Sequence, residues 1–89
     1  MKLKSGIIIS ELNGEFVAVP SGAASKDFNG MIRMNQTAAF IAKMFQTGAD
    51  EDDVVAALCR EYDVEESIAR EDFHAVKNQF EALHFFENE

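Results

Sequence analysis

The chain has 89 residues, of which 47% are hydrophobic, and we expect one domain with one core over residues 1–89. No N-terminal apolar run has the length of a signal peptide, and no stretch approaches about 20 consecutive apolar residues, so neither secretion nor a membrane span is expected. The single Cys59 cannot form an internal disulfide, which suits a reducing compartment. These features predict a cytoplasmic protein.

Charge is divided unevenly along the chain. Through Gln46 five Lys/Arg stand against three Asp/Glu, whereas from Thr47 onward three Lys/Arg stand against thirteen Asp/Glu, and the net charge is −8. A charge of this sign repels phosphate backbones, so no nucleic-acid partner is expected. The acidic half either keeps a small protein soluble or attracts a basic partner.

The first third of the chain has the pattern of β-strands. Residues 6–12 are rich in β-branched side chains and residues 15–20 alternate, and between them stands Asn13-Gly14, a dipeptide typical of a type I′ hairpin turn. Residues 21–29 are rich in Ser, Gly, Ala and Asn and predict a surface loop, after which residues 30–34 predict a third short strand.

At Asn35 the apolar period changes from 2 to 3.6. Asn35 suits a helix N-cap and Gly48 a C-cap, Asp50 caps a second helix, and a third helix is predicted from Asp63 to about Leu83. On a helical wheel the apolar residues of this third helix share one broad side, with Asp72 and Lys77 at its borders.

The order of three strands and then three helices, with tight joints, predicts an α+β domain. We expect a winged-helix-like fold in which a three-stranded antiparallel β-sheet is followed by three α-helices that cover it.

Catalytic and metal-binding patterns are lacking. Cys59 lies mid-helix beside apolar residues, His74 and His84 are too few for a zinc site, and the run from Asp50 to Asp53 lacks the spacing of a calcium loop. We therefore predict no enzyme activity, no metal and no cofactor.

An interaction surface is the remaining possibility. An edge strand offers unpaired main-chain groups to which another chain can add as a further strand. The predicted third strand would supply one side of a groove and the third helix the other. The predicted peptide-binding residues are Met31, Ile32, Arg33, Met34, Phe73, Val76, Lys77 and Phe80.

Several short motifs, in order along the chain, resemble those of the PqqD-like family. They are GMIRMNQTA at residues 30–38, TGADEDDVV at 47–55, LCREYDV at 58–64 and Asp72-Phe73. The resemblance spans nearly the whole chain, and the family's shared domain is also called the peptide recognition element of ribosomal peptide maturation.

The resemblance implies a function as well as a fold. In such domains the leader segment of a precursor peptide adds as a strand beside the third strand and packs against the third helix, and the domain presents it to a modifying enzyme such as a radical SAM protein or an ATP-dependent maturase. Two alternatives from other classes are a winged-helix regulatory module that binds DNA or protein through a helix, and a subunit that forms a homodimer through its free strand edge.

Overall fold

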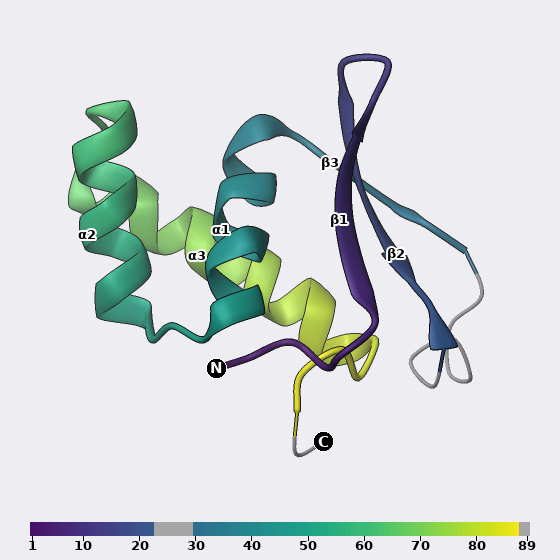
Figure 1. Ribbon diagram of the computed structural model, residues 1–89. Helices are drawn as coiled ribbons and strands as arrows, with labels where there is room; N and C mark the ends of the chain where they lie inside the picture. Colours follow the sequence, from purple (N-terminus) through teal and green to yellow (C-terminus); the bar gives the residue numbers. More distant parts are fainter. Residues whose placement is uncertain (23–29, 88–89) are drawn as a thin grey trace.

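The computed structural model describes residues 1–22 and 30–87, and most of the predicted loop over residues 21–29 lies outside them. The elements in chain order are β1 (Ile7–Leu12), β2 (Glu15–Pro20), β3 (Ile32–Met34), α1 (Gln36–Thr47), α2 (Glu51–Tyr62) and α3 (Glu66–Ala82). The strands form one antiparallel sheet in the order β1-β2-β3, and the three helices gather on one side of it (Figure 1). The α+β architecture and the element order are confirmed.

The hairpin between β1 and β2 follows from its turn residues. Asn13 has φ 54° and Gly14 has φ 83°, and the pairing of Leu12 with Glu15 leaves only these two residues in the turn. Both conformations lie in the region that a type I′ turn needs and that Asn and Gly tolerate best. The predicted turn is confirmed.

β3 is shorter than the five residues predicted. It pairs with β2 only through Ile32, Arg33 and Met34, opposite Ala18, Val17 and Phe16. Gly30 and Met31 precede the strand without joining the ladder, and Gly30 lies in a bend. The sequence therefore placed the strand correctly and its start two residues early.

The caps of the helices come partly from the residues predicted. The Asn35 Oδ1 accepts a hydrogen bond from the Ala38 N–H at 2.8 Å, and the Asp50 N–H donates to the Asp53 carboxylate at 3.1 Å. The prediction that α3 begins at Asp63 is wrong. Asp63 has φ 52° and ends α2, its N–H donating to the Cys59 carbonyl at 3.1 Å, and Glu65 is the N-cap of α3. A left-handed residue cannot continue a right-handed helix, and Asp tolerates that conformation better than most residues.

Phenylalanine side chains fill the centre of the molecule. Phe45, Phe73, Phe80 and Phe85 are at most 1% exposed. Phe45 meets Phe73 with ring centroids 5.7 Å apart and Phe86 at 5.0 Å, both edge-on, which is a favourable arrangement for aromatic pairs. These rings join α1, α3 and the C-terminal segment into one core.

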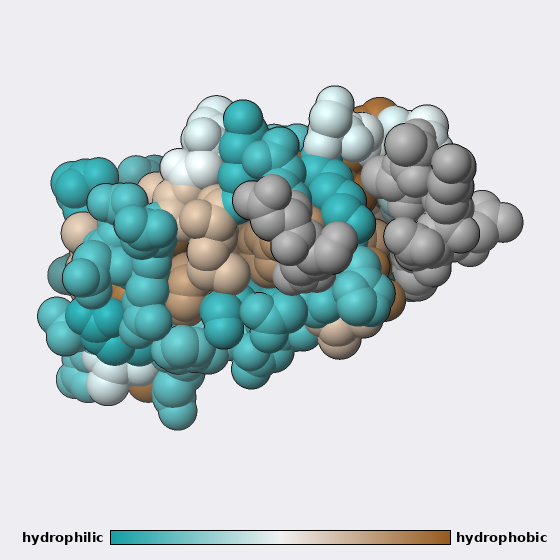
Figure 2. All heavy atoms as spheres, turned by 90° about the horizontal axis from the view of Figure 1, so that it is seen from below, coloured by the Kyte–Doolittle hydropathy of each residue, from teal (hydrophilic) through white to brown (hydrophobic). Residues whose placement is uncertain are grey.

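The two ends of the described chain close this core from below. The Leu3 N–H donates to the Phe45 carbonyl at 2.9 Å, the Glu87 N–H donates to the Lys2 carbonyl at 2.8 Å, and Leu3 forms an isolated bridge with Phe86. Figure 2 shows this side as a largely hydrophilic surface with apolar atoms gathered near its middle. Among the described residues, no helix has both the length and the apolar character that crossing a membrane demands.

Candidate functional site

The outer edge of β3 carries the first half of the candidate site. β3 is last in the sheet, so its ladder to β2 occupies one side only, and no strand of the described residues pairs with the other. Along it Ile32 is buried and Met34 half-buried, whereas Met31 is 52% exposed. The Arg33 side chain is 77% exposed and lies 3.7 Å from the Glu15 carboxylate. The strand thus has an anchored side and an open main-chain edge.

A small pocket lies at the end of this strand, where α1 begins and α3 passes. Its volume is about 130 Å³. Its lining comes from the β3–α1 junction and from one side of α3: Asn35, Thr37, Ala38, Ile41, Asp72, Ala75 and Val76. Ligand pockets for drug-sized molecules usually measure about 300–1,000 Å³, so this space suits a single side chain better than a cofactor. We call it the α1–α3 pocket.

The predicted residues of α3 fall into three different places. Val76 is 5% exposed and lines the α1–α3 pocket. Phe73 and Phe80 are 1% and 0% exposed, and the Phe80 ring packs against Phe85 with centroids 5.7 Å apart and a tilt of 45°, so both residues belong to the core. Lys77 is half-buried, with its Nζ 3.8 Å from the Glu81 carboxylate.

Helix geometry separates Lys77 from the pocket. At 3.6 residues per turn, Ala75 and Val76 lie within about 60° of Asp72 around the α3 axis, whereas Lys77 lies about 140° away. Lys77 therefore stands on the border of α3 that faces away from Asp72. The structure brings Val76 together with the other pocket residues, and neither Met34 nor Lys77 is on the pocket lining.

Most residues of the α1–α3 pocket are not among the predicted site residues. The sequence indicates a cap for Asn35, a first-turn position for Thr37, a core position for Ile41, and only a border of the apolar side for Asp72. The chain order places some of the pocket residues just after β3 and the others on α3. Which side of α3 meets the start of α1, however, depends on packing across the core. Two signals in the sequence concern these residues: Asn35, Thr37 and Ala38 belong to the GMIRMNQTA motif, and Asp72 is a carboxylate at the edge of an apolar helix face.

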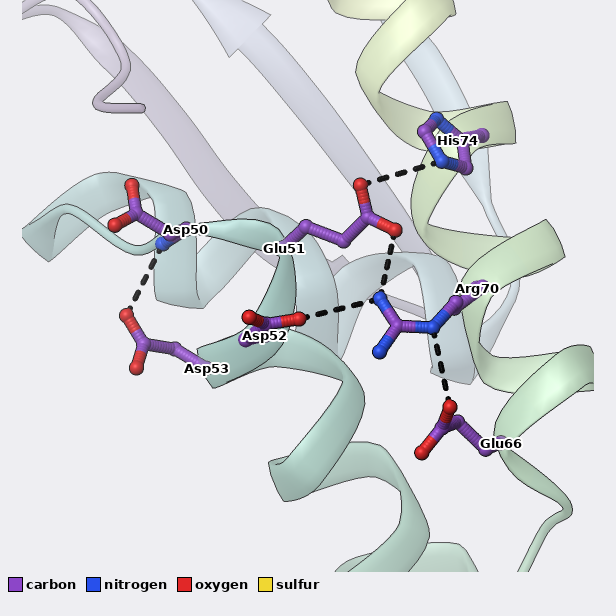
Figure 3. A network of polar contacts seen from close by, with 7 residues as sticks. All are labelled: Asp50, Glu51, Asp52, Asp53, Glu66, Arg70 and His74. Carbon is purple, nitrogen blue, oxygen red and sulfur yellow. Dashed lines mark hydrogen bonds and ion pairs between the residues drawn. The ribbon is translucent and has the colours of Figure 1, made fainter.

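A polar network fixes α3 against α2 on the side away from the pocket (Figure 3). Arg70 of α3 donates through Nη1 to the Glu51 carboxylate at 2.8 Å and to Asp52 at 3.3 Å, and through Nε to Glu66 at 3.4 Å. His74 Nε2 lies 3.3 Å from Glu51. The hydrogen bond from Arg70 holds the pKa of Glu51 below its usual value, and the same bond raises the pKa of Arg70. This network sets the position of the helix that forms the pocket wall.

The pocket has one charged residue on its described lining, Asp72. Across residues 1–22 and 30–87, no group of three or more His, Cys, Asp or Glu side chains could hold a metal ion. Cys59 is half-buried in α2, next to the core rather than on the pocket. What the arrangement offers is an open strand edge, apolar side chains and one carboxylate.

A three-stranded sheet with α1 packed on one side and α2 and α3 packed against α1 and each other, together with an open edge strand near a side-chain-sized pocket, defines a small winged-helix-like α+β domain. Residues 15–85 match the family model described as "Coenzyme PQQ synthesis protein D (PqqD)". That match covers well over half of the chain, so the chain belongs to the PqqD family, as the motifs predicted. No curated protein sequence matches the chain.

Two solved structures have the same fold. "TbiB1 in Complex with the TbiA(beta) Leader Peptide" matches with a TM-score of 0.76 at 16% identity, covering 100% of this chain and 98% of that one. "Lasso peptide synthetase B1 complexed with the leader peptide" matches with a TM-score of 0.69 at 23% identity, covering 91% of this chain and 89% of that one. At such identities the likeness establishes the shared architecture.

Proposed function

We propose that this chain binds the leader segment of a ribosomally made precursor peptide and presents it to a separate modifying enzyme, without catalysing a reaction itself. The observation that carries the proposal is the open edge of β3 beside the α1–α3 pocket. Membership of the PqqD family supports it, and so do the leader peptides bound to the two proteins of the same fold.

The leader adds to the sheet as a fourth strand along β3. Main-chain hydrogen bonds to the strand edge contribute roughly 0.5–1.5 kcal/mol each, and a buried apolar side chain contributes roughly 1.5–3 kcal/mol. Three or four such bonds and two or three buried side chains, less the entropy of ordering the peptide, are compatible with a micromolar complex of about −8 kcal/mol.

The predicted site residues take different parts in this complex. Met31 and Arg33, which are exposed, flank the added strand, while Ile32 and Met34 hold β3 onto the core. Val76 contacts a peptide side chain in the pocket, and Phe73 and Phe80 support Val76 from beneath. Lys77 is the predicted residue with the least support as a peptide contact, because it lies on the other border of α3.

The enzyme that receives the leader is proposed from the family. A radical SAM protein or an ATP-dependent maturase would act on the core segment of the same precursor while this domain retains the leader. A nucleic-acid partner is disfavoured because α3, which forms one wall of the pocket, carries Glu66, Glu71 and Glu81 in exposed positions.

Titration of fluorescently labelled candidate leaders, taken from short reading frames beside the gene, tests the proposal directly. We expect saturable binding in the micromolar range or tighter. A series of peptides N-methylated at one position each then tests the geometry. Because alternate residues of an added strand bond to the neighbouring edge, every second N-methyl group should weaken binding, by about 3- to 10-fold for one lost hydrogen bond. Absence of binding by every candidate and by peptides selected from a display library would overturn the proposal.

A pair of matched variants tests which edge of the sheet is used. Met31→Asp places a charge beside β3, and Leu12→Asp places the same charge on β1, at a residue of similar exposure (52% and 55%). We expect Met31→Asp to weaken binding of a leader at least about fivefold, since an uncompensated charge then faces the peptide. Leu12→Asp should leave it unchanged. Equal effects of the two substitutions would argue against addition at β3.

A further inference from the structure

We infer that the α1–α3 pocket selects peptides by a basic side chain, and that Asp72 is the residue that recognises it. The inference rests on the proposed function and adds a substrate class to it. A leader that fits this chain would place a Lys or Arg residue where the strand added to β3 passes the start of α1.

Asp72 stands in the pocket without a counter-charge. It is half-buried, and no described residue forms an ion pair or a hydrogen bond with its side chain. Arg70, two residues earlier on α3, is committed to Glu51, Asp52 and Glu66 on another side of the helix, and Lys77 lies near Glu81. A partly desolvated carboxylate without a partner gains most from a cation that arrives with the ligand.

The remaining lining fits the shape of a long basic side chain. Ala38, Ile41, Ala75 and Val76 supply apolar walls that can contact methylene groups, and the polar groups of the pocket belong to Asn35, Thr37 and Asp72. Lys and Arg bury an aliphatic stem against apolar surface while the charged end stays at a polar site. At about 30 Å³ per water molecule, the roughly 130 Å³ of space corresponds to four or five waters, about the size of such a stem with its head group.

The charge of the whole chain agrees with this polarity. With a net charge of −8, and thirteen of its sixteen acidic residues from Asp50 onward, the chain attracts basic peptides and disfavours acidic ones. Within the pocket, Asp72 is where a basic side chain would bind, because among the described residues it is the only charged one on the lining.

The experiment selects peptides from a display library of randomised 15-residue segments against the wild-type chain and three variants. Asp72→Asn removes the charge with little change of shape, and Asp72→Lys reverses it. Glu71→Gln, at the exposed neighbouring residue, is the matched control for loss of one negative charge. Urea unfolding of each variant establishes that it is folded.

We expect wild-type and Glu71→Gln selections to share apolar residues at alternate positions and a Lys or Arg at one fixed offset. Asp72→Asn should lose the basic preference, and Asp72→Lys should replace it with Asp or Glu. For a selected peptide, changing its basic residue to Met should weaken binding to the wild type about tenfold or more, the scale of a charge-assisted hydrogen bond, and leave binding to Asp72→Asn unchanged.

The outcomes separate the inference from the function on which it rests. Selected peptides with alternating apolar residues and no basic preference, or a preference that survives Asp72→Asn, would overturn the role of Asp72 while peptide binding stands. That role is equally excluded if Asp72→Asn lowers only the stability of the fold, because Asp72 then serves α1 rather than a ligand. If no peptide is enriched on any variant, the proposed function fails and this inference fails with it.

Discussion

Single residues at the ends of the helices determine how this small domain is joined together. Arg70 contacts carboxylates of α2 and α3, while Asn35 caps α1 at the point where β3 ends. Asn35 belongs to the lining of the α1–α3 pocket, and Arg70, on the opposite side of α3, fixes the helix that forms the other wall. Changes at these positions therefore act on stability and on the geometry of the site together.

The Arg70 network should make the free energy of unfolding depend on pH. Because the pKa of Glu51 is lowered in the folded chain, from a usual value of 4.5, its ionised form stabilises the fold above that value. That stabilisation is lost as the pH falls through the lowered pKa. Arg70→Met should reduce the free energy of unfolding at pH 7, and the difference from the wild type should shrink toward pH 3.

Urea unfolding at both pH values measures this difference. Arg60→Met is the matched control, because Arg60 has no ion pair with a described residue, and its smaller effect should vary less with pH. A difference for Arg70→Met that stays constant from pH 7 to pH 3 would contradict the assignment of the network to ionised carboxylates.

The Asn35 cap gives a second prediction at this scale. Asn35→Ala removes the acceptor of the Ala38 N–H and should reduce the free energy of unfolding by about 0.5–2 kcal/mol. Asn35→Ser should keep most of the stability that Asn35→Ala loses. Asn78→Ala, at an exposed position within α3, should cost nothing, because Ala favours a helix interior. Thermal or urea unfolding distinguishes the three variants, and a loss in Asn78→Ala as large as that in Asn35→Ala would contradict the capping role.

At the scale of elements, one side of α3 packs in the core and another side lines the pocket. The side centred on Phe73 and Phe80 holds the helix in the core, and the side that carries Asp72 and Ala75 faces the pocket. The sequence pattern predicted that this helix would have one broad apolar side, and it named Phe73, Val76, Lys77 and Phe80 as peptide contacts without separating core from pocket. The distinction between support and contact needed the structure, since the apolar period alone does not say which border meets α1.

This division predicts different effects for two substitutions in the same helix. Phe80→Leu leaves a gap among buried rings and should reduce the free energy of unfolding by roughly 1–3 kcal/mol. Ile68→Ala, at a residue that is 44% exposed, should change it by less than about 0.5 kcal/mol. Urea unfolding measures both. Similar losses of stability in the two variants would contradict the assignment of Phe80 to the core and of Ile68 to the surface.

Taken as a whole, the molecule combines a net negative charge with an open strand edge at β3 and the α1–α3 pocket near the end of that strand. The charge of −8 acts over distances of about a Debye length, roughly 8–10 Å at 0.10–0.15 M salt. Contacts at the strand edge and in the pocket act only once the peptide is bound. Electrostatic attraction should therefore affect mainly the rate of association, and these short-range contacts mainly the rate of dissociation.

A basic leader should thus associate more slowly as salt increases. Between about 50 and 500 mM NaCl we expect the association rate constant to fall several-fold, while the dissociation rate constant changes little. Stopped-flow fluorescence with a labelled basic peptide measures both, and the same peptide with its basic residues replaced by Gln is the control. A salt effect confined to dissociation would contradict the steering role of the surface charge.

The sequence by itself determined the number, type and order of the elements, the Asn13-Gly14 turn and the Asn35 cap, because each depends on residues only a few positions apart. Only the tertiary structure decided which residues of α3 are core and that Asp72 lies near the start of α1. Those features depend on how aromatic side chains pack between elements distant in the chain, and a local sequence pattern does not specify the crossing angle of two packed helices.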